Sequence, residues 1–78
     1  MSTTSLDLVK EGRRAVIRGF NGECGWTRRL QCMGITPGTE VEVLLNRKRG
    51  PLVLRVKNGT EISIGRGLAR KIAVEVLE

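Results

Sequence analysis

Apolar and polar residues alternate with a period of two along most of this chain, apart from one stretch in its first half. Such alternation is typical of β-strands that bury one face and expose the other. It predicts five strands, over residues 13–20, 39–45, 52–57, 61–64 and 72–76. In the first strand both faces carry apolar residues, so the pattern leaves its buried face open. In the other four, the expected inward residues are Val41, Val43, Leu45, Leu52, Leu54, Val56, Ile62, Ile64, Ile72, Val74 and Val76.

The exceptional stretch, residues 24–33, follows the period of a helix. Trp26, Leu30 and Met33 fall at i, i+4 and i+7, which places them on one apolar stripe. We expect a short helix here, with Leu30 and Met33 capping the core and Trp26 partly exposed near the helix start.

Glycine and proline mark the ends of these elements. Gly34 stands where a helix needs a left-handed residue after its last turn. In the 36–39 segment, Pro37 presets φ and Gly38 is free to take a positive φ, which predicts a tight turn. Residues 58–59, Asn-Gly, predict a two-residue hairpin turn of type I′. The 65–70 segment is too short for a full helix and predicts a 3₁₀ turn.

These elements together favour a mainly β fold. Five short strands, a long first connection that carries one capping helix, a tight hairpin and a late 3₁₀ turn describe a small SH3-like barrel. We predict one domain over residues 1–78. Leu6 and Leu8, which precede the first strand, are expected to plug one end of the barrel.

The charge of the chain narrows the choice of partner. Lys and Arg number 14 against 8 Asp and Glu, a net charge of +6. The basic residues are scattered, however, and Phe20 and Trp26 are the only aromatic residues. Proteins that bind single-stranded nucleic acid stack bases on several aromatic side chains. A basic surface for a protein or for the inner membrane leaflet is therefore favoured over nucleic-acid binding. Two aromatic residues are also too few for the aromatic groove with which SH3 domains bind proline-rich peptides.

The two cysteines do not form an obvious site. Cys24 and Cys32 are eight positions apart, which is about 12 Å along a helix and too far for a disulfide. We interpret them as reduced thiols. The alternatives are an intermolecular disulfide and a weak transition-metal site completed by carboxylates of a second chain, both of which leave self-association open.

Other classes are disfavoured. The chain has no histidine, its carboxylates are spread out, and Gly65 and Gly67 lack the remainder of a phosphate-binding loop. An enzyme is therefore not expected, and no cofactor is required. No apolar run approaches 18 residues and no signal peptide precedes the first strand, so we expect a cytoplasmic protein without membrane insertion.

Four segments carry a resemblance to a known family. They read RRLQCMGITPGTEVEVL at Arg28–Leu44, GPLVLRV at Gly50–Val56, NGTEISIGRGLARKI at Asn58–Ile72 and VEV at Val74–Val76. The chain resembles the FeoA family from about residue 13 onward. The resemblance implies a small cytoplasmic SH3-like barrel without chemistry of its own. It also implies a partner, FeoB, the membrane protein that imports ferrous iron and has a cytoplasmic GTP-binding region.

An accessory role of this kind needs a contact surface that mixes apolar and basic groups. The candidates on the predicted helix are Trp26, Arg28, Arg29 and Met33. Those on the loop between the second and third predicted strands are Arg47, Lys48 and Arg49. Leu44 and Val53, on the outward face of the strands, are a second possibility, unless they pack under the helix or a loop. The alternative function is that of a nucleic-acid-binding, KOW-type SH3-like module.

Overall fold

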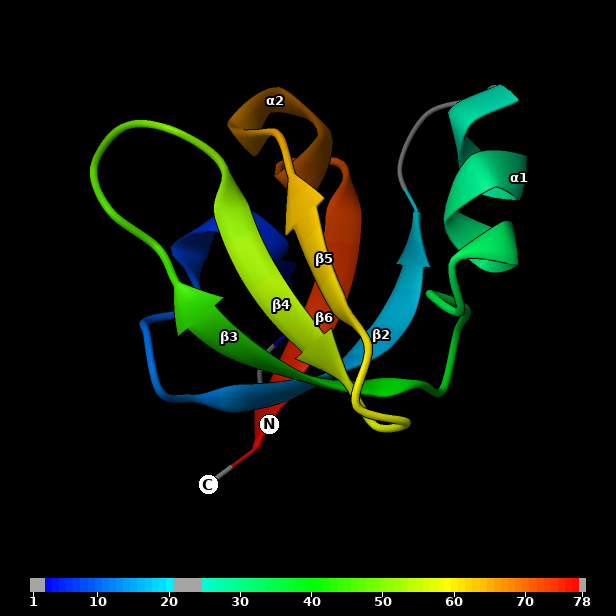
Figure 1. The fold of residues 1–78 in the computed structure, drawn as a ribbon, viewed down its shortest axis with the longest axis horizontal. Coiled ribbons are helices and arrows are strands. Elements are labelled where there is room, and N and C mark those ends of the chain that lie inside the picture. Colours follow the sequence, from blue (N-terminus) through cyan, green and yellow to red (C-terminus); the bar gives the residue numbers. More distant parts are fainter. Residues whose placement is uncertain (1–2, 21–24, 78) are drawn as a thin grey trace.

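The protein folds as one curved antiparallel sheet with two short helices (Figure 1). A computed structural model describes residues 3–20 and 25–77. Within them the strand order is β1-β6-β2-β3-β4-β5, so β1 and β5 are the two edges. No pairing among the described residues joins these edges, so the sheet curls into a barrel that stays open. The strands are β1 (Thr3–Ser5), β2 (Arg14–Phe20), β3 (Glu40–Leu45), β4 (Leu52–Val56), β5 (Glu61–Ile64) and β6 (Ile72–Leu77).

All five predicted strands are present, and the sheet has one more. The additional strand, β1, pairs with β6, with Thr3 opposite Glu75 and Ser5 opposite Ala73. Its three residues are all polar, so it carries no apolar alternation for a pattern to reveal. This strand forms because its backbone pairs with β6, and not because its own side chains are buried in an alternating pattern.

One apolar core lies inside the curl of the sheet. Ala15 and Ile17 are fully buried, which establishes the inward face of β2. Leu6 is also fully buried, in the 3₁₀ turn η1 (Leu6–Leu8), but Leu8 is 66% exposed. The expectation that both leucines plug the barrel is therefore wrong for Leu8. The core consists of Leu6, Val9, Ala15, Ile17, Leu30, Ile35, Val41, Val43, Leu52, Leu54, Val56, Ile62, Ile64, Ala69, Ile72 and Val74, with Phe20, Leu68 and Val76 packed against it.

A register shift in β3 corrects one of the predicted inward positions. Val43 lies opposite Leu54, but Leu45 lies opposite Val53 instead of Leu52. An extra residue in one strand turns every later side chain to the other face. Leu45 therefore shares the outward face with Val53, contrary to the prediction, and is only half-buried. The alternation alone cannot reveal such a bulge, because Leu44 and Leu45 are both apolar.

The helix α1 (Gly25–Cys32) ends in a Schellman motif. The N–H of Ile35 donates to the carbonyl of Leu30 at 2.9 Å, and that of Gly34 donates to Gln31 at 3.0 Å. Gly34 has φ of 91°, as predicted. Leu30 and Ile35 are both buried, whereas Met33 is 37% exposed. The prediction that Met33 caps the core is wrong, because the chain reverses at Gly34 and Ile35 enters the core instead.

The other turns are close to those predicted. The N–H of Thr39 donates to the carbonyl of Thr36 at 3.0 Å, and Gly38 has φ of 94°, which confirms that turn. The hairpin after β4 has a three-residue loop, residues 57–59, instead of two. The N–H of Gly59 donates to Val56 and that of Val56 donates to Thr60, both at 2.8 Å. A turn followed by one left-handed glycine gives this bulged form.

The late turn is helical, not 3₁₀. In α2 (Arg66–Ala69) the N–H of Ala69 donates to Gly65 at 3.0 Å and that of Arg70 donates to Arg66 at 3.1 Å. These bonds span four residues, which defines an α-turn. The sequence did not predict the α-helical turn, because glycine-rich segments do not favour a helix. Burial of Ala69 in the core stabilises the turn.

The left-handed conformation at the end of α1 can be tested with Gly34→Ala. A Cβ here would have its nearest neighbour, Val56 Cγ1, at 3.9 Å, so no clash arises. The strain is that of an L-residue at positive φ, and we expect the free energy of unfolding to fall by about 1–2 kcal/mol. Urea denaturation measures this, with Gly67→Ala as control. Gly67 lies within α2 with open space around it and should be neutral or slightly stabilised. Equal stability of the two variants would contradict the prediction.

The corrected position of Met33 leads to a second prediction. Leu30→Ala removes a side chain that is 1% exposed, and we expect it to destabilise the protein by about 2–4 kcal/mol. Met33→Ala should change stability by less than about 1 kcal/mol, because its side chain is partly in water. Thermal unfolding of both variants distinguishes them, and comparable losses would show that Met33 belongs to the core after all.

Candidate functional site

The exposed side of α1 carries the residues expected to contact a partner. Arg28, Arg29, Cys32 and Met33 are all exposed, and we call these four the helix surface. Leu30 anchors the helix from its opposite side. Trp26 was predicted to join this surface, but its side chain lies outside the described part of the structure.

An open groove runs beside the helix surface. One wall is formed by Cys32 and Met33 at the end of α1. The other is formed by Asn58, Thr60 and the first three residues of the edge strand β5. Glu61 and Ser63 of this strand are exposed and Ile62 is 8% exposed. The groove thus joins a thiol, a thioether and a strand edge, a mixture suited to contact with a protein segment.

The helix surface carries two positive charges, Arg28 and Arg29, both exposed. Among the ion pairs of the described residues, none includes Arg28 or Arg29. As far as the described residues show, both guanidinium groups are therefore available to carboxylates of another molecule.

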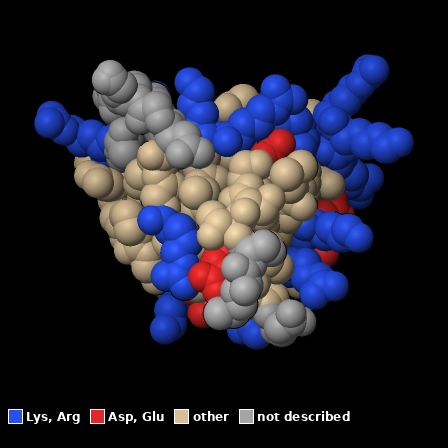
Figure 2. Space-filling view, turned by 180° about the vertical axis from the view of Figure 1, so that it is seen from behind, with Lys and Arg blue, Asp and Glu red and all other residues tan. Residues whose placement is uncertain are grey.

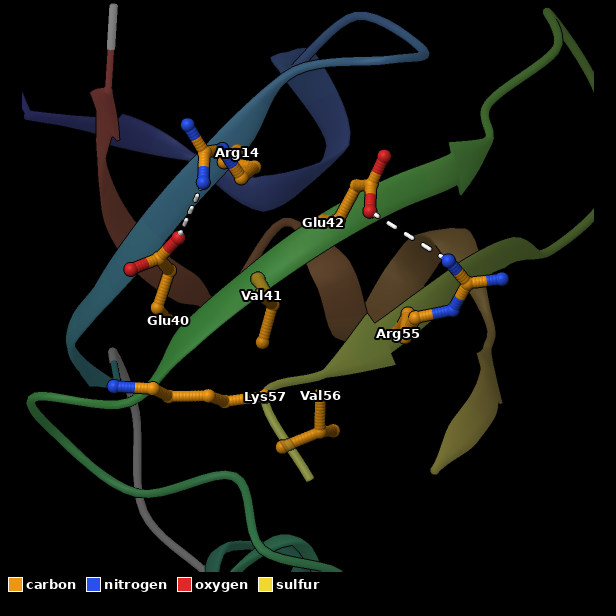
Figure 3. Close-up of a pocket in the computed structure, with 7 residues that line it drawn as sticks. All are labelled: Arg14, Glu40, Val41, Glu42, Arg55, Val56 and Lys57. Carbon is orange, nitrogen blue, oxygen red and sulfur yellow. Dashed lines mark hydrogen bonds and ion pairs between the residues drawn. The ribbon is translucent and has the colours of Figure 1, made fainter. Parts of the chain in front are cut away.

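A second hollow, on the outer face of β2, β3 and β4, has a different character (Figure 3). Arg14 pairs with Glu40 at 3.3 Å, and Arg55 lies between Glu42 at 3.9 Å and Glu61 at 3.3 Å. The carboxylates and guanidinium groups neutralise one another across the strands. This hollow is a cross-strand charge ladder, and Lys57 also lines it.

The predicted basic loop lies away from the helix surface. Arg47, Lys48 and Arg49 are exposed in the connection between β3 and β4, and Arg47 pairs with Glu11 at 3.3 Å. In Figure 1 this loop and α1 lie toward opposite ends of the longest axis of the molecule. The two sets of candidate residues therefore belong to different surfaces.

Leu44 and Val53 are half-buried. Val53 lies opposite Leu45 on one side and Ser63 on the other, so any apolar patch here is interrupted by a serine. A contact surface at Leu44 and Val53 therefore stays a prediction.

The described residues do not assemble a metal site. No group of three His, Cys, Asp or Glu side chains gathers within the described ranges. Cys32 is an exposed free thiol, and Cys24 lies outside the described residues. A transition-metal site with ligands from a second chain therefore stays a prediction. No helix in the described part of the chain is long and apolar enough to cross a bilayer.

Sequence reasoning missed the residues that organise the basic loop. The amide of Asn46 bonds the carbonyls of Asp7 and Val9, and its Oδ1 accepts from Arg66. The partners are 20 or more positions away in the sequence. A polar residue directly after an apolar strand was the only signal available.

The comparisons with known proteins agree with this fold. Residues 4–76 match the FeoA domain. A Methanocaldococcus jannaschii protein named "Putative Fe(2+) transport protein A" is 41% identical over 73 residues, which cover 94% of this chain and 87% of the relative. A crystal structure of FeoA, an iron uptake regulatory protein, superposes with a TM-score of 0.89 at 29% identity, covering 97% of this chain and 100% of the other.

A third comparison concerns the fold alone. Stenotrophomonas maltophilia FeoA, crystallised with zinc and described as an SH3 domain protein, superposes with a TM-score of 0.79 at 21% identity. The match covers 92% of this chain and 89% of the other. The predicted SH3-like fold is confirmed. The match over residues 4–76 and the relative that is 41% identical show that the chain belongs to the FeoA domain family.

Proposed function

We propose that this protein is a non-enzymatic accessory factor of ferrous iron uptake, which binds the cytoplasmic part of a FeoB-type transporter through the helix surface. It would act in the cytoplasm and would need no cofactor of its own. The observation that carries the proposal is the pair Arg28 and Arg29. Among the described residues they take part in no ion pair, and they lie beside a groove lined by both apolar and polar side chains.

The chemistry of this surface supports a protein partner. Interfaces combine a buried apolar centre with charged groups at the rim. Met33 supplies a flexible, polarisable side chain that adapts to different shapes, and the two arginines supply paired donors for carboxylates. The relative named for Fe(2+) transport supports the choice of iron uptake as the process.

The nucleic-acid alternative has less support. Phe20 is packed against the core, so it is not available for base stacking, and Trp26 is the other aromatic residue of the chain. Binding of a phosphate backbone would weaken steeply with salt. Absence of any DNA or RNA retardation at low salt would remove this alternative.

The proposal predicts that charge reversal on α1 weakens binding. We expect Arg28→Glu with Arg29→Glu to reduce affinity for the purified cytoplasmic domain of the transporter roughly tenfold, because two exposed contacts become repulsive. Biolayer interferometry with the immobilised domain measures the dissociation constant.

The matched control is Lys10→Glu with Arg13→Glu. Both side chains are exposed and in no ion pair of the described residues, and the change in net charge is the same. The control should bind nearly as well as the unmodified protein. Equal weakening of both variants would argue against the helix surface, and no binding of the unmodified protein would overturn the proposed function.

A further inference from the structure

Asn46 joins the basic loop to the N-terminal segment of the chain. Its Nδ2 donates to the carbonyl of Asp7 at 3.0 Å and to that of Val9 at 2.6 Å. These two carbonyls flank Leu8. The start of the β3–β4 loop therefore lies directly against the backbone that carries Leu8.

The helix α2 joins the same end of the barrel. Arg66 Nη2 donates to Asn46 Oδ1 at 3.0 Å and also to the carbonyl of Arg47. In addition, α2 packs against η1, and Arg70, just after α2, lies 3.8 Å from Asp7. Three segments that are far apart in the sequence are thus fixed together by named contacts.

The side chain of Leu8 is exposed to solvent at the end of the barrel where η1, α2 and the β3–β4 loop meet. Its exposure of 66% is the largest among the large apolar side chains of the described residues. The residues on either side, Asp7 and Val9, are tied to Asn46, and Val9 is 1% exposed. The backbone is thus anchored while the leucine side chain projects from it. The core does not use this side chain, and the helix surface does not include it.

Basic side chains come from the two segments that contact the residues on either side of this leucine. Arg47, Lys48 and Arg49 come from the loop, and Arg70 and Lys71 follow α2; all five are exposed. We call these residues, with Leu8, the basic end: Leu8, Arg47, Lys48, Arg49, Arg70 and Lys71. Figure 2 shows lysine and arginine gathered along the upper rim, with few acidic groups among them.

The positive charge of the basic end is only partly neutralised. Glu11 pairs with Arg47 and Asp7 lies near Arg70. Lys48, Arg49 and Lys71 take part in no ion pair among the described residues. At least three cations therefore remain available to an anionic ligand.

The shape and composition of the basic end favour an extended anionic surface over a single small ligand. Neither the groove beside the helix surface nor the hollow on β2, β3 and β4 is lined by any of its residues, and the six residues of the basic end include no aromatic side chain on which a base could stack. Separate cations around one projecting apolar side chain are the elements of peripheral membrane binding, in which phosphates attract the charges and the apolar group enters the headgroup boundary.

We propose that the basic end docks on the surface of an anionic lipid bilayer, with Leu8 entering the headgroup–acyl boundary and the lysine and arginine side chains on lipid phosphates. Binding of this kind is weak and reversible, because one leucine and a few charges supply much less binding free energy than a membrane-spanning helix. The proposal concerns a different surface from the helix surface and does not depend on the partner proposed above.

The test is flotation of the full chain with vesicles of phosphatidylcholine alone and of phosphatidylcholine mixed with phosphatidylglycerol. We expect binding to the anionic vesicles only, weakening with salt. Lys48→Glu with Arg49→Glu should lower the partition coefficient at least 25-fold, since each basic group contributes about fivefold. Leu8→Ser should lower it several-fold through the lost apolar contact, with an unchanged circular dichroism spectrum because Leu8 is exposed.

The matched control is Arg28→Glu with Arg29→Glu, which makes the same change in net charge on α1. It should retain most of the vesicle binding. Equal losses for the two pairs, no binding of anionic vesicles at low salt, or an unchanged partition of Leu8→Ser would each overturn the proposal. Loss of binding to the transporter domain on reversal of Lys48 and Arg49, without any vesicle binding, would assign the basic end to a protein partner and would also overturn it.

Discussion

A single apolar core, lined by one face of every long strand, is the constraint on which the rest of this structure depends. A chain of 78 residues buries a modest fraction of its surface, so it has little stability in reserve. Each strand must present its apolar face to the same interior. The outward faces are then free for charge, and they carry the ladder that runs from Arg14 and Glu40 to Arg55 and Glu61.

Because the core holds α1 from its buried side, the exposed side of the helix is available for contact with a partner. Leu30 attaches α1 to the core, and the reversal at Gly34 returns the chain to the sheet. The arginines of the helix surface therefore stand on an element that is held from behind. The basic end is organised differently, by polar contacts of Asn46 and Arg66. The helix surface thus stands on apolar packing alone among the contacts described, whereas the basic end adds side-chain hydrogen bonds to the burial of Val9 and Ala69.

The sequence predicted most of the fold because the strands follow a period of two and the turns have characteristic residues. Gly34 and the turn at 36–39 were identified from their chemistry alone. The misses have physical reasons. The bulge near Leu44 lies between two apolar residues, so nothing in the pattern marks it. The polar strand β1 forms by pairing with β6, and α2 is supported by tertiary burial. Met33 and Leu8 were misplaced because an apolar residue near the end of an element can face either way.

The candidate surfaces were less predictable than the fold, because they depend on distances between remote segments.

The two edge strands of the sheet are short. An open barrel leaves two strands whose outer backbone groups are unpaired, and long exposed edges allow copies of a protein to join sheet to sheet. Here the edges are only three and four residues long, β1 and β5, and Glu61 begins one of them. A second molecule could form only a few backbone hydrogen bonds to either edge, and at β5 it would also contact the charge of Glu61. An open barrel of this kind therefore disfavours association of copies through their sheet edges.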